Sequence, residues 1–298
     1  IATAADLREW AQRDETGYSA LGPARLLLWR ADAPDGAEPE DPAVYTWLRR
    51  LPCPTIAISS DATPRAATCA ADVVVPDRAS AEQLAACIER SPLAAAVLVQ
   101  VLRSTEHVPI AQALVTESLA YATLQSGPEF QRWRQSHETR APSTLPPAEP
   151  LLLTRDDARL QIRLNHPQRH NAMSVAMRDA LVEALRLVLL DQQIRDVGIS
   201  GAGSCFSSGG DLDEFGTTPD PVTGHLVRSL SLPGALIARC AERTTVRVHG
   251  RCLGAGIEFP AFAQRVIAAP DSSFELPELQ FGLIPGAGGC VSVPRRIG

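Results

Sequence analysis

The second half of the chain alternates short apolar runs with longer amphipathic segments. Two strands are predicted in "EPLLLTRDDARLQIRLN" (149–165), joined by a turn at Asp156 and Asp157, and a helix in "SVAMRDALVEALRLVLLDQ" (174–192). Three more strands are predicted in "VGISGAG", "TTVRVHG" and "RVIAAP", and a glycine turn that enters a helix in "RCLGAGIEFPAFAQ". This alternation indicates an α/β domain in which helices pack on a sheet.

The first half opens with a helical pattern and continues with three runs typical of buried strands, in "ARLLLWR", "RLPCPTIAISS" and "AADVVVPD". The segment "SAEQ" has the pattern of a capping box, with Ser80 at the N-cap and Gln83 three residues later. Ser91 followed by Pro92 predicts a second helix that begins at Pro92. Two further helices are predicted in "PIAQALVTESLAYATL" and "PEFQRWRQS".

A proline-rich stretch, "RAPSTLPPAEP" (140–150), separates these halves. Two consecutive prolines cannot continue a helix, so this stretch is the best candidate for a linker. The sequence therefore predicts an N-terminal α/β-helical module at 1–145 and a second domain at 146–298.

Composition narrows the class of protein. The chain has 298 residues, of which 45% are hydrophobic and 21% charged, as in ordinary soluble globular proteins. Its net charge of -6 argues against nucleic acid or a membrane surface as partner. No apolar run approaches the roughly 18 residues that a membrane span requires.

The seven cysteines are scattered and never form a CxxC pair, which favours reduced thiols and a cytoplasmic location. The histidines show no metal-binding spacing, so no metal site is predicted. The chain contains no lysine, and all 28 basic residues are arginine. Schiff-base chemistry and a P-loop lysine are therefore excluded within this chain.

Two glycine-rich turns, "GAGSCFSSGGD" and "GRCLGAGIEF", follow predicted strands. Such turns expose backbone N–H groups that suit an anion or a developing oxyanion. A dinucleotide fingerprint fails because Phe206 stands where its third glycine is needed, and the GxSxG elbow of serine hydrolases is absent. Glu258 and Glu278 lie in apolar surroundings, where carboxylates are costly to bury; they are either surface acids or functional groups.

Four segments, in order, resemble the enoyl-CoA hydratase/isomerase (crotonase) superfamily over residues 151–298: "RLNHPQRHNAM", "GAGSCFSSGGDLDEF", "VRVHGRCLGAGIEF" and "FELPELQFGLIPGAGG". Each glycine motif alone is weak, but four in the family's order are specific. The resemblance implies an α/β fold with a crotonase-like ββα spiral core, joined here to a helix-rich N-terminal module.

The resemblance also implies a catalytic mechanism. The backbone N–H groups of Gly210 and Ala255 would form the oxyanion hole for a thioester carbonyl, and Glu258 and Glu278 would together hold one water. Retention of both acids favours an enoyl-CoA hydratase, a lyase that adds water syn to a trans-2-enoyl-CoA. The alternatives are a double-bond isomerase of the same superfamily and a non-catalytic acyl-CoA-binding scaffold.

The same resemblance implies an acyl-CoA partner, with no cofactor beyond the coenzyme A of the substrate, and a homo-oligomer, either trimer or hexamer. Arg169 is expected either to meet a CoA phosphate or to be solvated. The implied substrate-binding residues are Gln168, His170, Ala172, Ser208, Gly209, Asp211 and Leu212.

Residues 72–135 resemble the helical tail that family members carry after the core. The first half is therefore interpreted as a degenerate crotonase-like module. Its helices are expected to pack on the core of the second half, within the chain or across an oligomer, because an uncovered core would expose a large apolar patch.

Overall fold

The structure is a computed structural model that describes residues 1–13, 17–31, 41–60, 66–137 and 149–297. Two compact units divide the chain, Ile1–Arg103 and Ser104–Gly298. This division differs from the expected one at 145/146, because the two helices before the predicted linker lie in the same unit as the second half. The linker itself, at 140–150, lies almost entirely outside the described residues.

The first unit has a parallel three-stranded sheet, ordered β1 (Leu27–Arg30), β2 (Thr55–Ile58) and β3 (Val73–Val75). The three predicted strand runs all contain one of these strands. β2 is buried throughout, but β3 is not a buried strand as predicted: Val73 and Val74 are 40% and 44% exposed. The helices of this unit are α1 (Ala4–Arg13), α2 (Pro42–Arg50), α3 (Ala66–Cys69), α4 (Arg78–Arg90) and α5 (Pro92–Thr105).

The start of α4 corrects the predicted capping box. The helix begins at Arg78, and the Asp77 carboxylate accepts a hydrogen bond from the Ser80 N–H (2.8 Å). Aspartate caps a helix at least as well as serine, so Asp77 takes the N-cap and Ser80 falls inside the first turn. The next helix, α5, begins at Pro92 as predicted.

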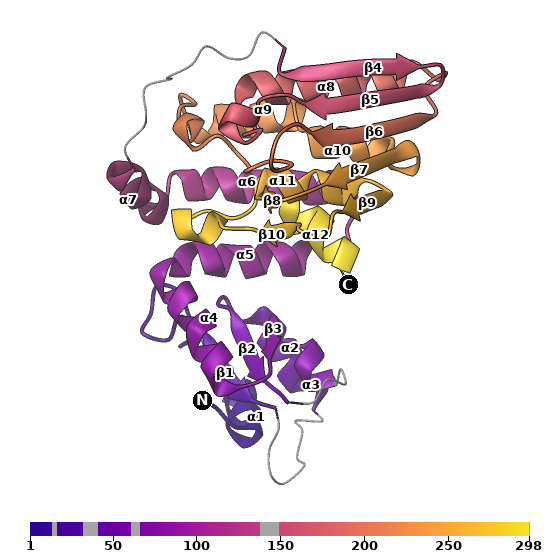
Figure 1. The fold of residues 1–298 in the computed structure, drawn as a ribbon. Helices are drawn as coiled ribbons and strands as arrows, with labels where there is room; N and C mark the ends of the chain where they lie inside the picture. The colour runs from indigo at the N-terminus through magenta and orange to yellow at the C-terminus, as the bar shows by residue number, and fades with distance from the viewer. Residues whose placement is uncertain (14–16, 32–40, 61–65, 138–148, 298) are drawn as a thin grey trace. The chain divides into compact units, whose positions relative to one another are not determined.

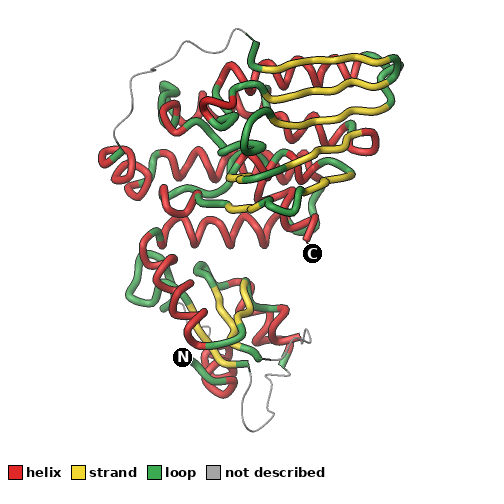
Figure 2. Tube along the Cα trace, in the orientation of Figure 1, coloured by secondary structure: helices red, strands yellow, loops and turns green. Residues whose placement is uncertain are grey.

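The second unit is built on a five-stranded sheet, with strand order β4-β5-β6-β7-β9 (Figures 1 and 2). β4 pairs antiparallel with β5, and the remaining pairs are parallel. A separate parallel pair joins β8 to β10. The strands are β4 (Leu151–Asp156), β5 (Arg159–Leu164), β6 (Asp196–Gly201), β7 (Thr244–Val248), β8 (Arg251–Leu253), β9 (Arg265–Ala268) and β10 (Ser273–Glu275).

Helices α8 (Val175–Leu190) and α10 (Pro233–Arg239) lie along one face of this sheet (Figure 1). Ser174 caps α8 by accepting the Met177 N–H (3.3 Å), and buried side chains recur along one stripe of the helix at Met177, Leu181, Leu185 and Val188. That stripe packs against Ile162, Ile199 and other strand residues to form the main apolar core. The α/β class and the predicted strand–helix order of this half are confirmed.

The other helices of the unit are α6 (Ile110–Gln125), α7 (Pro128–Ser136), α9 (Pro221–Leu230), α11 (Ala255–Glu258) and α12 (Gly289–Ile297). Short 3-10 turns cover Pro167–Arg169, Leu212–Glu214, Ala241–Arg243, Pro260–Phe262 and Glu278–Phe281. The helix predicted after the second glycine turn is thus short, since Pro260 cannot donate a backbone hydrogen bond and the chain continues as a 3-10 turn.

The helices α6 and α7, which precede the second half in sequence, pack on its core. Ala113 and Leu114 of α6 belong to the same buried cluster as Phe262 and Val291. Phe130 of α7 is 1% exposed. Within the described ranges no single helix is long and apolar enough to cross a membrane, although the bent pair α4 and α5 passes by length and composition alone.

The first unit is tied together by one buried ion pair. The Arg103 guanidinium donates from Nε and Nη2 to the Asp72 carboxylate (2.8 and 2.6 Å) and from Nη1 to the Leu51 carbonyl (2.6 Å). Asp72 also accepts the backbone N–H and the hydroxyl of Thr55 (2.7 and 2.9 Å). The two charged side chains are only 13% and 10% exposed.

We expect Arg103→Met to lower the free energy of unfolding by about 3–5 kcal/mol, because it leaves the Asp72 charge buried without its partner. Urea titration followed by tryptophan fluorescence measures this, since three of the four tryptophans lie in the first unit. The control is Arg78→Met, which breaks an exposed pair with Glu82 and should cost at most about 0.5 kcal/mol. Equal effects of the two substitutions would contradict the role given to Arg103.

Candidate active site

Two glycine loops meet at one end of the sheet of the second unit. The Leu253 N–H donates to the Ser207 carbonyl (3.1 Å), which joins the loop after β6 to the loop after β8. Gly209 has φ +89°, and a Cβ there would lie 2.6 Å from the Leu253 carbonyl oxygen. The close approach therefore requires glycine at this position.

Asn171, which was not predicted as a site residue, holds the first of these loops. It is fully buried, and its Nδ2 donates to the carbonyls of Ala202 (2.7 Å), Phe206 (3.0 Å) and Cys205 (3.1 Å). The Asn171 carbonyl accepts the Ser207 hydroxyl (2.8 Å). The asparagine in "RHNAM" was a visible signal, but its spacing gave no indication of these partners.

The predicted oxyanion donors lie on these two loops. Gly210 follows Gly209, and Ala255 is the first residue of α11, where backbone N–H groups have no partner within the helix. Among the described residues, neither the Gly210 nor the Ala255 N–H donates to another protein group. Both donors are therefore available to a ligand.

The carboxylates of Glu258 and Glu278 converge beside Gly254. A Cβ at Gly254, which has φ +47°, would lie 2.6 Å from Glu278 Oε1 and 3.8 Å from Glu258 Oε1. Glu258 and Glu278 are 2% and 7% exposed. Glu258 Oε2 accepts the N–H groups of Ala287 (2.7 Å) and Gly289 (2.9 Å). The surface-acid alternative for this pair is therefore wrong.

Burial changes the protonation of both acids. It raises the pKa of Glu258 to about 7, against the opposing effect of the backbone N–H groups that it accepts. Burial, reinforced by the charge of Glu258, raises the pKa of Glu278 to about 9. Glu278 Oε2 is buried with no hydrogen-bond partner among the described residues. Two neighbouring carboxyls with separated pKa values can serve as a base and an acid.

A third buried carboxylate, Glu117 of α6, lies in the same region. It is 1% exposed and accepts the N–H groups of Gly288 (2.7 Å) and Cys290 (2.8 Å). Burial and the charge of Glu258 raise its pKa well above the usual range. This residue was not predicted from the sequence, although a glutamate in the largely apolar segment "VTESLAYATL" is the same kind of signal as Glu258.

A cavity of about 1000 Å³ opens from the glycine loops. Of the predicted substrate-binding residues, only Gly209 does not line it, because its backbone is packed against Leu253. The oxyanion donor Gly210 lines the cavity as well. Its wall consists of Ser136, His137, Gln168, Arg169, His170, Ala172, Ser208, Gly210, Asp211, Leu212, Asp213 and Leu253.

Arg169 is the one cation in this wall. Its Nη2 pairs with Asp211 (2.9 Å) and Asp213 (2.7 Å), so it is neither simply solvated nor free of protein partners. These aspartates raise its pKa above the usual value for arginine. Any phosphate that reaches Arg169 must share the guanidinium with two carboxylates.

Helix α7 contributes to the same wall through an aromatic cluster. Trp133 stacks on His137 with 4.7 Å between ring centroids, and it lies 5.0 Å from Phe281 and 6.3 Å from Phe215. Phe215 follows the Gly210 loop, and Phe281 follows Glu278. The cluster thus connects a helix of the first half to the segment after the Gly210 loop and to the turn that carries Glu278.

Comparison with known proteins decides the family. The family model described as enoyl-CoA hydratase/isomerase matches residues 155–298. This stretch belongs to that family. The crotonase resemblance of the four segments is therefore confirmed.

Two curated relatives differ in activity. A 2,3-dehydroadipyl-CoA hydratase of Escherichia coli is 30% identical over 148 residues, which are 50% of this chain and 57% of that protein. The mouse mitochondrial Delta(3,5)-Delta(2,4)-dienoyl-CoA isomerase is 27% identical over 150 residues, 47% of this chain and 46% of its own. The chain thus spans about half the length of the curated relatives it matches. Among solved structures, an enoyl-CoA hydratase of Mycobacterium smegmatis is 28% identical, with a TM-score of 0.45 over 50% of this chain and 58% of that one.

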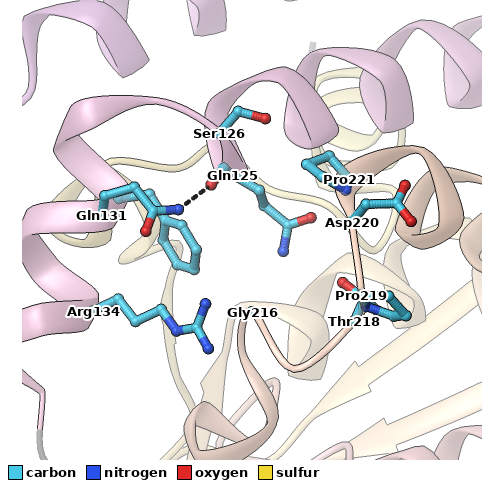
Figure 3. Close-up of a pocket in the computed structure, with 10 residues that line it drawn as sticks. Gln125, Ser126, Gln131, Arg134, Gly216, Thr218, Pro219, Asp220 and Pro221 are labelled. Atoms are coloured by element: carbon cyan, nitrogen blue, oxygen red, sulfur yellow. Dashed lines mark hydrogen bonds between the residues drawn. The ribbon is translucent and has the colours of Figure 1, made fainter.

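A second, smaller cavity of about 180 Å³ lies between the α6–α7 turn and the start of α9 (Figure 3). The Gln131 side chain donates to the Gln125 carbonyl (2.8 Å) at its rim, and Gln125 Oε1 is buried without a hydrogen-bond partner in the described residues. Arg134, from the same helix as Gln131, points toward Gly216. None of the predicted site residues of this enoyl-CoA hydratase/isomerase domain lines it.

We expect Gly209→Ala to lower the free energy of unfolding by about 1–3 kcal/mol, because alanine is strained at positive φ and its Cβ meets the Leu253 carbonyl. Urea unfolding followed by far-ultraviolet circular dichroism measures the change. The matched control is Gly224→Ala in α9, where an added Cβ has no neighbour closer than 3.4 Å. The control should be neutral or stabilising by up to about 1 kcal/mol. A Gly209→Ala protein as stable as the control would contradict the proposed contact.

Proposed function

We propose that the protein is an enoyl-CoA hydratase that adds water to a trans-2-enoyl-CoA thioester. The observation that carries the proposal is the convergence of Glu258 and Glu278 beside Gly254, next to two loops with free backbone N–H groups. The enoyl-CoA hydratase/isomerase family implies acyl-CoA substrates. The likeness to the Escherichia coli hydratase, which covers half of this chain, supports hydration as the reaction.

Each group has a role that its surroundings favour. The thioester carbonyl accepts the N–H groups of Gly210 and Ala255, which stabilise the negative charge of the developing enolate. Glu258, with a pKa of about 7, is partly ionised at neutral pH and takes a proton from the water that attacks the β-carbon. Glu278, with a pKa of about 9, remains protonated and delivers its proton to the α-carbon.

The step balances without any other reactant. The water oxygen forms a bond to the β-carbon, the π electrons move toward the carbonyl, and the enolate then takes the proton of Glu278 at the α-carbon. Glu258 has gained one proton and Glu278 has lost one, so a proton transfer between the two acids restores the starting state. Because both carboxylates lie beside Gly254, both additions are expected on one face of the substrate.

Isomerisation of a double bond is the second candidate, favoured by the likeness to the mouse dienoyl-CoA isomerase. An isomerase moves one proton between two carbons and needs no bound water. Separate incubations with a 2-enoyl-CoA and a 3-enoyl-CoA distinguish the two reactions. A non-catalytic acyl-CoA-binding scaffold would turn over neither substrate. A trimeric or hexameric assembly and a cytoplasmic location remain predictions.

We expect Glu258→Gln and Glu278→Gln each to lower the kcat of hydration by about 10²-fold or more, because the amide keeps the size and removes the ionisable group. The loss of absorbance of the conjugated enoyl thioester measures hydration. The matched control is Glu183→Gln in α8, a glutamate outside the catalytic pair, which should change kcat less than about twofold. Near-native hydration by either site variant would rule out the two-glutamate mechanism.

We expect the kcat/KM of hydration to have a bell-shaped pH dependence. Activity rises as Glu258 loses its proton near pH 7 and falls as Glu278 loses its proton near pH 9. Since the two acids are neighbours, the limbs report the pair rather than either residue alone. Initial rates from pH 5 to 10 measure the profile. A flat profile across this range would exclude the assigned protonation states.

A further inference from the structure

The backbone segment 287–290 is held by two carboxylates that take alternate amides. Glu258 Oε2 accepts the first and third N–H of the segment. Glu117 accepts the second through Oε1 (2.7 Å) and the fourth through Oε2 (2.8 Å). Glu258 comes from α11 and Glu117 from α6, which lie more than a hundred residues apart in the sequence.

We propose that Glu117 is a positioning residue for Glu258, and this inference rests on the proposed function of that residue. By accepting the amides of Gly288 and Cys290, Glu117 holds in place the alternate amides, those of Ala287 and Gly289, that donate to Glu258. A buried N–H without an acceptor costs about 1–3 kcal/mol, so without Glu117 the segment would turn toward other acceptors. Glu258 Oε1 would then leave its place beside Gly254.

Helix α6 is itself bonded to helix α9 at this point. The Ser118 hydroxyl accepts Arg228 Nε (3.1 Å) and lies 2.9 Å from His225 Nδ1, both from α9. The Arg228 guanidinium lies 4.5 Å from the centre of the Tyr121 ring. Tyr121 in turn packs against Gly286, where an added Cβ would clash with the ring. Glu117 therefore projects from a helix that is bonded to α9 and that packs on the same glycine-rich segment through Tyr121 and Leu114.

Several titratable groups act on the site around Glu258. They are Glu278, Glu117 and Tyr121, together with the Cys290 thiol of α12 and, beyond Tyr121, the Arg228 guanidinium. Only Glu117 shares the amides of segment 287–290 with Glu258. The backbone N–H groups of Ala287 and Gly289 lower the pKa of Glu258. A Glu117 variant that lets segment 287–290 move away should therefore make Glu258 ionise at higher pH.

The test is Glu117→Gln in the full chain, read by two measurements. Carbon-13 NMR of labelled glutamate carboxyls gives the titration midpoint of Glu258, assigned by comparison with Glu258→Gln. Steady-state hydration of an enoyl-CoA gives kcat and KM. The matched control is Glu129→Gln, a buried glutamate of the neighbouring helix α7.

We expect Glu117→Gln to raise the Glu258 midpoint by about 0.5 pH unit or more, because Glu258 then loses part of the backbone hydrogen bonding that favours its ionised form. We also expect kcat to fall about tenfold while KM changes less than about threefold, since Glu117 does not line the large cavity. The control should leave the midpoint unchanged. An unchanged midpoint together with an unchanged kcat in Glu117→Gln would overturn the proposal.

A wild-type measurement covers the case in which Glu117→Gln does not fold. The amide protons of Gly288 and Cys290 should shift together with those of Ala287 and Gly289 when Glu258 ionises, because the two carboxylates hold all four amides on one segment. Amides of Gly288 and Cys290 that do not respond between pH 5 and 10 would overturn the proposal. If the wild-type chain hydrates no enoyl-CoA, the proposed function fails, whereas these NMR titrations still decide how Glu117 acts on Glu258.

Discussion

The burial of three carboxylates beside one backbone segment is the constraint that shapes this site. An ionised carboxylate loses several kcal/mol of solvation when it leaves water, and only hydrogen bonds to fixed donors offset that loss. Segment 287–290 supplies four such donors to Glu117 and Glu258. Glu278 receives no comparable donor on Oε2, and its pKa is accordingly the higher of the candidate pair. The difference in backbone donors between Glu258 and Glu278 thus helps to separate their pKa values.

The glycines around the site follow from the same constraint. Backbone amides reach a carboxylate or a thioester only where no side chain stands between them. A Cβ at Gly254 would strike Glu278, and one at Gly289 would lie 2.7 Å from Glu258 Cγ. At these positions glycine is therefore required because a glutamate side chain packs directly against the backbone, and not only because the chain turns.

Local patterns predicted most of the framework of the second unit and part of its site. Strands β4 to β7 and β9, helices α6 to α8 and the pair Glu258 and Glu278 could be predicted from apolar periodicity and motif order, whereas strand β8 lies in a segment that was predicted as a glycine turn. Glu117 and Asn171 could not, because their roles depend on partners distant in sequence: Asn171 contacts residues about thirty positions away, and Glu117 contacts residues more than 170 positions away. The start of α4 was misplaced for a local reason, since Asp77 and Ser80 both qualify as caps and sequence alone does not rank them.

Chain order matters less to this site than packing does. Helices α6 and α7 precede the five-stranded sheet in sequence. Even so, Glu117 of α6 accepts an amide of the segment next to α12, and Trp133 of α7 packs against both Phe215 and Phe281. The entropy of closing a loop grows only slowly with its length, by about 0.6 kcal/mol for each doubling. Leaving the amides of Gly288 and Cys290 unpaired would cost more than such a difference in loop length. A helix that supplies these contacts can therefore come before or after the core in the sequence. The position of the helix is set by the carboxylate that accepts these amides.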